Sequence, residues 1–186
     1  MSEDVEVQVI IQQVFALRQQ LSDFEQRLPS NLKFVSRNLY LHANTSQRIT
    51  FIMLQSWWYE CHCNLYRFSL PGFRESIDLT SQNAAFAHHC RQQVLESALA
   101  QSSFWQSIAK MGHILVSDPN IVVLVYSNTK TLLAARKLRG ILTSEQCNSS
   151  LDKSEISTLL ASNVSFLDEL AKRFPRVAAA VSTKPP

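Results

Sequence analysis

Apolar residues recur at alternating spacings of three and four through several long segments of the chain, and this pattern restricts the fold most. Side chains at this spacing share one face of an α-helix but no single face of a strand, so the segments are predicted to be amphipathic helices. A first seam lies within residues 5–28 and a second within residues 46–69. The first comprises Ile10, Val14, Leu17, Leu21, Phe24 and Leu28, and the second comprises Phe51, Leu54, Trp58, Cys61, Leu65 and Phe68.

Prolines and polar capping residues set the ends of these two helices. Pro29 ends the first, because proline cannot continue a helix, and an irregular connection with a short helical piece near Leu39 is expected to follow. Thr45 or Ser46 can cap the second helix, which Pro71-Gly72 stops. The residues from 80 to 112 predict a third helix, capped by Thr80 or Ser81, and a shorter fourth one.

Ser102-Ser103 is expected to separate those two helices, and Gly112 to close the shorter one. The segment 121–138 has two interpretations. Its β-branched start is typical of a buried strand, but apolar character continues through about 18 residues toward Gly140, and this length favours a helix.

The last predicted helix covers residues 152–173 and ends at Pro175. Its inner side is expected to hold the apolar residues, and Asp168 with Lys172 would form an outward pair one turn apart. The inner residues are Ile156, Leu159, Leu160, Val164, Leu167 and Leu170.

The chain contains only three glycines in 186 residues. Rossmann folds, P-loop proteins and hairpin-rich β proteins need glycine where φ is positive, so the composition argues against all three. We therefore expect an all-α protein, an irregular multi-helix bundle of about six to seven helices. Residues 1–176 would form a single helical domain, and residues 177–186 a flexible tail.

Charge and cysteine usage are typical of a reduced intracellular protein without a nucleic-acid stripe. The net charge is +3, with 18 basic and 15 acidic residues interspersed. The acidic N-terminus is not a targeting segment, and a membrane span is not expected. The four cysteines have no disulfide-framework spacing.

Cys61, His62 and Cys63 raise the question of a metal or catalytic site. Successive helical residues are about 100° apart, so neighbouring side chains cannot face one ion, and His88-His89-Cys90 has the same adjacency. Both cysteines near residue 60 fall on apolar stripes, which predicts small buried side chains. No nucleophile with a base and a paired orienting group is evident, so we expect no metal site, no catalytic residue, no cofactor and no enzymatic activity.

Aromatic residues surround these cysteines, and they have two interpretations. They could line a pocket for an apolar small molecule, or they could fill the core. The residues proposed to contact an effector or a partner are Trp57, Trp58, Tyr59, Tyr66 and Arg67.

Three stretches of the sequence resemble a known family in their order and spacing. They are "YECHCNLYRFSLPGFRES", "CRQQVLESALAQSSFW" and "DPNIVVLVYSNTKTLL", within residues 46–172. Together they are similar to the regulatory middle homology region, or fungal-specific transcription factor domain, of fungal zinc-cluster transcription factors. The matching positions are Tyr59, Cys63, Leu65, Tyr66, Arg67, Pro71, Phe73, Cys90, Gln93, Ala98, Trp105, Asp118, Pro119, Tyr126, Thr131, Leu132 and Leu133.

This resemblance implies an all-helical regulatory domain in a fungal nucleus, modulating transcription by RNA polymerase II through protein or effector contacts. The family's six-cysteine module and its two zinc ions have no counterpart here, so no zinc and no direct DNA contact are expected from this chain. The early part of the regulatory domain has no counterpart either, which implies the C-terminal portion of such a factor. The alternative is a helical small-molecule-binding or protein-interaction module with no role in transcription.

Overall fold

The described part of the chain is built from seven α-helices and contains no β-strand, which confirms the all-α multi-helix bundle. The computed structural model describes residues 3–79, 81, 83–112, 117–141 and 153–182. A short 3-10 helix, η1, covers Ser30–Leu32. The α-helices are α1 Glu3–Arg27, α2 Ser36–His42, α3 Arg48–Arg67, α4 Ala84–Met111, α5 Asn120–Ile141, α6 Lys153–Arg173 and α7 Pro175–Ser182.

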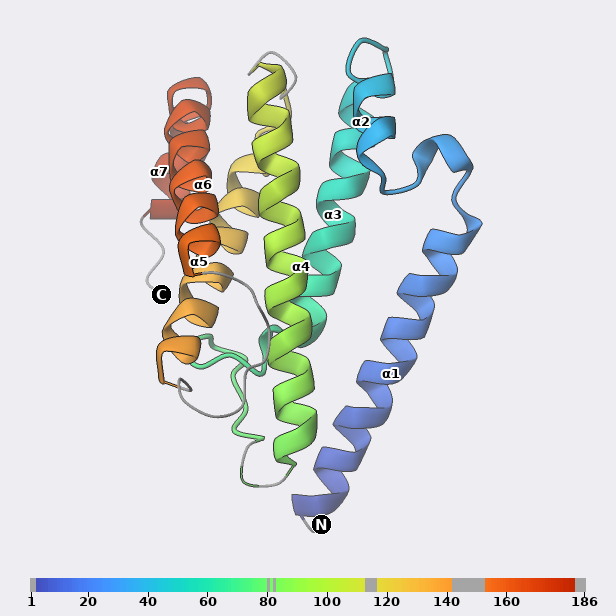
Figure 1. Ribbon diagram of the computed structural model, residues 1–186, viewed down its shortest axis with the longest axis vertical. Helices are drawn as coiled ribbons and strands as arrows, with labels where there is room; N and C mark the ends of the chain where they lie inside the picture. Colours follow the sequence, from blue (N-terminus) through green and yellow to red (C-terminus); the bar gives the residue numbers. More distant parts are fainter. Residues whose placement is uncertain (1–2, 80, 82, 113–116, 142–152, 183–186) are drawn as a thin grey trace.

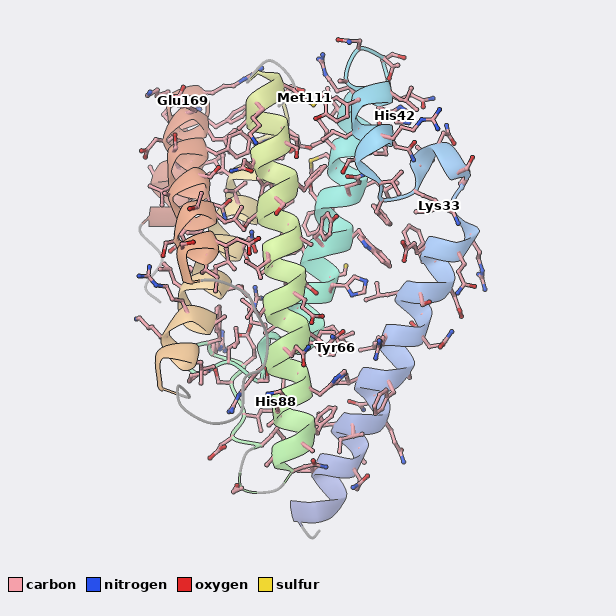
Figure 2. The ribbon with its side chains drawn as sticks, viewed as in Figure 1. Lys33, His42, Tyr66, His88, Met111 and Glu169 are labelled. Carbon is pink, nitrogen blue, oxygen red and sulfur yellow. The ribbon has the colours of Figure 1, made fainter. Side chains whose placement is uncertain are left out.

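Helix α4 is the central element, because it packs against α3, α5 and α6. Helix α1 lies along one flank of the bundle and rests on α3, while α7 lies behind α6 and contacts both α5 and α6 (Figure 1). The space between the ribbons of α1 and α3 is occupied by side chains (Figure 2). The amphipathic spacing in the sequence thus becomes a bundle in which each helix buries its apolar side against a neighbour.

The core consists of three neighbouring clusters of buried side chains. The largest contains Phe51 from α3, Trp105 from α4, Val125 from α5 and Phe166 from α6. Because these residues come from four helices, burial of this cluster holds the bundle together.

Helix α4 runs unbroken from Ala84 to Met111, so the predicted break at Ser102-Ser103 is wrong. Serine is only a weak helix breaker, and its effect depends on whether its hydroxyl competes with the backbone. The Ser102 hydroxyl instead accepts hydrogen bonds from Asn128 and Asn163 on neighbouring helices. Tertiary contacts therefore keep the helix continuous.

The N-terminal end of α4 differs from the sequence prediction, whereas the C-terminal end agrees with it. Asn83, rather than Thr80 or Ser81, caps the helix, and its Oδ1 accepts a hydrogen bond from the backbone N–H of Phe86 at 3.0 Å. Gly112 follows the last helical residue with a φ of 100°, a conformation that a side chain disfavours.

The segment from residue 121 onward is helical, which decides the choice between helix and strand. Helix α5 covers Asn120–Ile141. Val122 and Val125 are both buried, whereas Val123 between them is 44% exposed, which is the spacing of a helix face and not of a strand. The β-branched content of the sequence alone could not distinguish the two.

The C-terminal region departs from expectation in three details. Residues 177–182, expected in a flexible tail, belong to α7, which Pro175 begins at a first position that suits proline. Val164 is 49% exposed rather than inside. Lys172 pairs with Glu169 at 2.6 Å, not with Asp168, since residues three apart also share a helix face.

Candidate functional site

The five residues predicted to contact an effector or partner do not converge on one site. They follow each other along α3, so the helix turns them toward different neighbours. Trp57 is 50% exposed, whereas Trp58 and Tyr66 are buried. Tyr59 and Arg67 are half-buried, on the sides of α3 that meet different helices.

Trp58 packs against aromatic residues of the N-terminal part of the chain and so links that part to α3. Its indole stacks on the ring of Phe34 at a centroid distance of 4.7 Å and an interplanar angle of 6°, and Phe24 of α1 packs beside it at 6.1 Å. His62, one turn later on α3, meets the indole edge-on at 4.3 Å. Aromatic contacts of this kind stabilise the packing beyond the area that they bury, so Trp58 is a core residue here.

Tyr66 also belongs to the core. It is buried beside Cys90, and its ring meets that of His89 edge-on at 6.2 Å. Burial raises the pKa of the Tyr66 phenol, so it stays protonated at neutral pH.

Arg67 is the centre of a polar cluster between α3, the turn after it and α5. The Arg67 cluster is defined here as Glu60, Arg67, Glu75 and Ser127. Arg67 Nε donates to Glu75 Oε1 at 2.8 Å, and Arg67 Nη1 donates to Ser127 Oγ at 2.8 Å and lies 3.5 Å from Glu60 Oε1. Ser127 Oγ in turn donates to Glu60 Oε1 at 2.9 Å.

The Arg67 cluster is largely shielded from water on one side and open on the other. The Glu60 side chain is 7% exposed and that of Arg67 19%, whereas Glu75 reaches solvent. The guanidinium also lies over the ring of Phe73 at 5.2 Å, a cation–π contact. Lys130 of α5 approaches the same ring at 5.9 Å. Arg67 thus lies beside a buried carboxylate and links three segments, which are α3, the turn after it and α5. The other oxygen of that carboxylate, Glu60 Oε2, is buried without a hydrogen-bond partner in the described part of the chain.

The cysteines near this cluster are not arranged for nucleophilic or metal chemistry. Cys63 is buried as predicted, but Cys61 is exposed, which corrects the expectation that both are interior. Two residues along a helix are about 200° apart, so only one of the pair can face α4. Burial, with a further contribution from Glu60, raises the pKa of both thiols, and burial raises the pKa of Cys90 to about 11.

A raised pKa leaves the thiol protonated and poorly nucleophilic. Cys63 Sγ donates instead to Gln101 Oε1 at 3.7 Å across the α3–α4 interface. Within the described ranges, no group of three or more His, Cys, Asp or Glu side chains could hold a metal ion. Cys147 lies outside the described residues.

A buried layer of amides and a hydroxyl joins α4, α5 and α6, and the sequence reading missed it. Ser102 Oγ accepts from Asn128 Nδ2 at 2.7 Å and from Asn163 Nδ2 at 2.9 Å, and all three residues are fully buried or nearly so. The available signal was that Asn128 and Asn163 fall among apolar residues on the inner faces of their helices. The polar side chains must meet to offset their burial, so this layer specifies how the three helices align.

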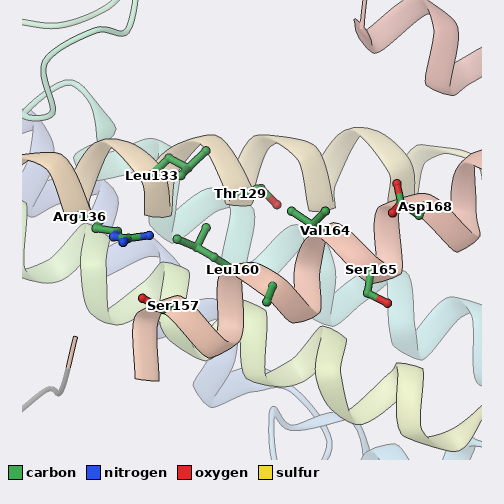
Figure 3. A pocket seen from close by; sticks show the side chains of 9 residues that line it. Thr129, Leu133, Arg136, Ser157, Leu160, Val164, Ser165 and Asp168 are labelled. Atoms are coloured by element: carbon green, nitrogen blue, oxygen red, sulfur yellow. The ribbon is translucent and has the colours of Figure 1, made fainter. Parts of the chain in front are cut away.

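An open groove runs along the outside of α5 and α6 (Figure 3). It has a volume of about 500 Å³, and Arg136 and Asp168 lie at its opposite ends with Leu160 and Val164 between them. Leu133 and Val164 leave apolar surface exposed there. The groove is too open to enclose a small molecule.

Comparison of the chain with protein-family models, with curated proteins and with solved structures found no significant match. Among the described residues, no helix combines the length and the apolarity that crossing a bilayer requires.

Proposed function

We propose that this chain is a helical regulatory module of a fungal zinc-cluster transcription factor, corresponding to the C-terminal portion of its middle homology region. In this role it acts in the nucleus and modulates transcription by RNA polymerase II. Its partners are proteins of the transcription machinery or other regions of the same factor, together with a small effector. It contributes no DNA contact and no catalytic step.

The observation that carries the proposal is the ordered set of three family-like stretches in residues 46–172. Their packing supports it, because residues of each stretch belong to a single buried cluster: Cys63 of α3, Ala98 and Leu99 of α4, and Leu132 of α5. Residues from all three stretches therefore form one folding unit.

The Arg67 cluster supplies a physical route for regulation in this proposal. Arg67 and Phe73 belong to the first family-like stretch and Ser127 to the third, so the cluster joins two of the three stretches. The partly buried side chains of this cluster have few alternative hydrogen-bond partners. Breaking their contacts would therefore favour a different packing of α3 against α5. An effector that binds one packing better than the other would then shift their populations.

A reporter assay tests the proposed role. The chain is fused in a yeast nucleus to a heterologous DNA-binding domain, once alone and once together with a constitutive activation domain, so that activation and repression are both detected. The proposal expects a change in reporter output in one of the two contexts. The Arg67→Met variant should alter that change, whereas Arg37→Met, at an exposed position of α2, should not. Unchanged output in both contexts, at matched nuclear protein levels, would contradict the proposal.

Sequencing of the transcript upstream of the Met1 codon provides an independent test. The proposal expects an open reading frame that continues upstream into a six-cysteine cluster of the form C-x-x-C-x(6)-C and a similar second half. An in-frame stop codon directly upstream, with no such cluster in any transcript of the locus, would contradict the assignment to this family.

A further inference from the structure

The open groove on α5 and α6 exposes apolar side chains between two opposite charges. Leu133 of α5 is 43% exposed and Val164 of α6 is 49% exposed there, beside buried Leu160. Exposed apolar surface that is rimmed by polar residues marks interaction sites on folded proteins. Because the groove is too open to enclose a small molecule, the occupant expected from its shape is the surface of a protein.

Small side chains on α6 allow a second helix to approach closely. Ser157, Ala161 and Ser165 line the groove at intervals of four residues, so they share one face of α6. The distance between two packed helices depends on the size of the side chains at their contact. A helix that lies against this face can therefore come near enough to cover Val164 and Leu133.

Arg136 and Asp168 place opposite charges at the two ends of this groove (Figure 3). Arg136 lies at the same end as Ser157, which is about 16 Å from Asp168 along α6 at 1.5 Å per residue. This separation exceeds the Debye length of about 8 Å at physiological salt, so the two charges do not neutralise each other within one chain. Both residues are exposed, and within the described ranges neither forms an ion pair. Lys172, one turn after Asp168, pairs instead with Glu169 at 2.6 Å.

A two-fold axis makes such a face complementary to itself. In an isologous dimer, the residue at one end of the interface meets the residue at the other end on the partner, and the reverse contact also forms. An axis through the middle of the groove would place Arg136 of each protomer beside Asp168 of its partner. It would also bring the two Val164 side chains together. An unrelated partner would need an acid and a base at this same spacing, which a second copy of the chain already has.

We propose that the α5–α6 face is a dimer interface, and that the same face of a second copy of this chain occupies the groove. The face is two helices wide and about 30 Å long, so it offers roughly the 800 Å² per partner that a standard specific interface buries. Since few apolar side chains are exposed on it, we expect a dissociation constant in the micromolar range. The inference concerns assembly and does not rest on the proposed role in transcription.

Sedimentation equilibrium of the full chain, at concentrations that span the micromolar range, measures this association. We expect the mean mass to rise with concentration from the 21.1 kDa of one chain toward twice that value. The data should fit a monomer–dimer equilibrium without larger species, because an isologous contact closes on itself.

Charge reversal tests the two-fold arrangement. Arg136→Asp gives a chain with an acid at both ends of the groove, and Asp168→Arg gives one with a base at both ends. Each variant alone should dimerise at least tenfold more weakly, since two attractions become two repulsions. An equimolar mixture of the two variants should dimerise again, because both contacts of the mixed dimer join an acid to a base. Lys137→Asp, exposed on α5 but outside the groove, is the control and should leave the affinity unchanged.

A pair of valine variants tests the apolar part of the interface. Val164→Lys should abolish dimerisation, because the two-fold axis would bring two ammonium groups together in an apolar contact. Val123→Lys is the matched control, since Val123 of α5 is 44% exposed but does not line the groove. Both positions are exposed, so both variants should fold, as circular dichroism at 222 nm can establish.

Three results would overturn the proposal. The first is a mass that stays at 21.1 kDa at every concentration, which would leave the groove to a different protein. The second is a dimer that survives Val164→Lys. The third is a mixture of folded Arg136→Asp and Asp168→Arg chains that remains monomeric where the unmodified chain dimerises. If either charge variant does not fold, the comparison of Val164→Lys with Val123→Lys decides the matter.

Discussion

Replacing Arg67 with methionine tests whether the Arg67 cluster stabilises the packing of α3 against α5. Methionine keeps an unbranched apolar chain of similar reach but removes the guanidinium. The variant leaves the Glu60 carboxylate, with its side chain only 7% exposed, without its cation and with Ser127 Oγ as its remaining hydrogen-bond donor among the described side chains. It also removes the 2.8 Å bonds to Glu75 and Ser127.

The size of the effect follows from the burial of the two partners. Removing one partner of a buried ion pair costs about 3–5 kcal/mol, because the other charge remains desolvated and unpaired. The Arg67 side chain is 19% exposed, so water can reach the Glu60 carboxylate in the variant. We therefore expect a loss at the lower end of this range. We expect a loss of about 3 kcal/mol in the free energy of unfolding, which corresponds to a fall in Tm of roughly 6–12 °C for a chain of this size.

Urea unfolding followed by circular dichroism at 222 nm measures this loss. The midpoint should fall while the m-value stays constant, since the buried area is preserved. Arg37→Met is the matched control, and its exposed position on α2 should limit the change to about 0.5 kcal/mol.

A double-mutant cycle identifies the cause. Because Glu60→Gln removes the buried charge, the Glu60→Gln and Arg67→Met double variant should lose about 1–2 kcal/mol less than the sum of the single losses. Additive losses, or an Arg67→Met loss no larger than that of Arg37→Met, would refute the idea that Arg67 neutralises a buried carboxylate.

Three further predictions follow from the surroundings of α3. Trp58→Ala should lower the free energy of unfolding by about 3–5 kcal/mol, whereas Trp57→Ala, half-exposed on the same helix, should change it by about 0.5 kcal/mol or less; equal losses in urea unfolding would contradict the packing. Iodoacetamide should label Cys61 in the folded chain and spare buried Cys63, as tandem mass spectrometry can establish, and rapid labelling of both would be inconsistent with this burial. Burial and, secondarily, the charge of Arg18 lower the pKa of His62 in the folded chain below its usual 6.5. As the pH falls below 6.5, His62 therefore takes up a proton in the unfolded chain more readily than in the folded chain, and the folded chain loses stability. Relative to His62→Gln, the unmodified chain should therefore lose more stability between about pH 7 and pH 5; parallel curves would refute this.

The order of the helices and the all-α class could be predicted from the sequence, because helix formation depends on local spacing. The seam in residues 5–28, the stop at Pro71-Gly72 and the long apolar run after Asn120 correspond to α1, to the end of α3 and to α5. The burial of Cys63 was also predictable from its stripe, but the same argument was wrong for Cys61, which is exposed.

Contacts between distant residues decided the rest. Whether Ser102-Ser103 breaks α4 depends on Asn128 and Asn163, which are 26 and 61 residues away from Ser102. Likewise, Arg67 finds Ser127 at a separation of 60 residues. No local pattern in the sequence records which face of a helix meets which neighbour. Local spacing sets the helices because their hydrogen bonds join residues four apart, whereas pairing, burial and empty space depend on how the helices pack.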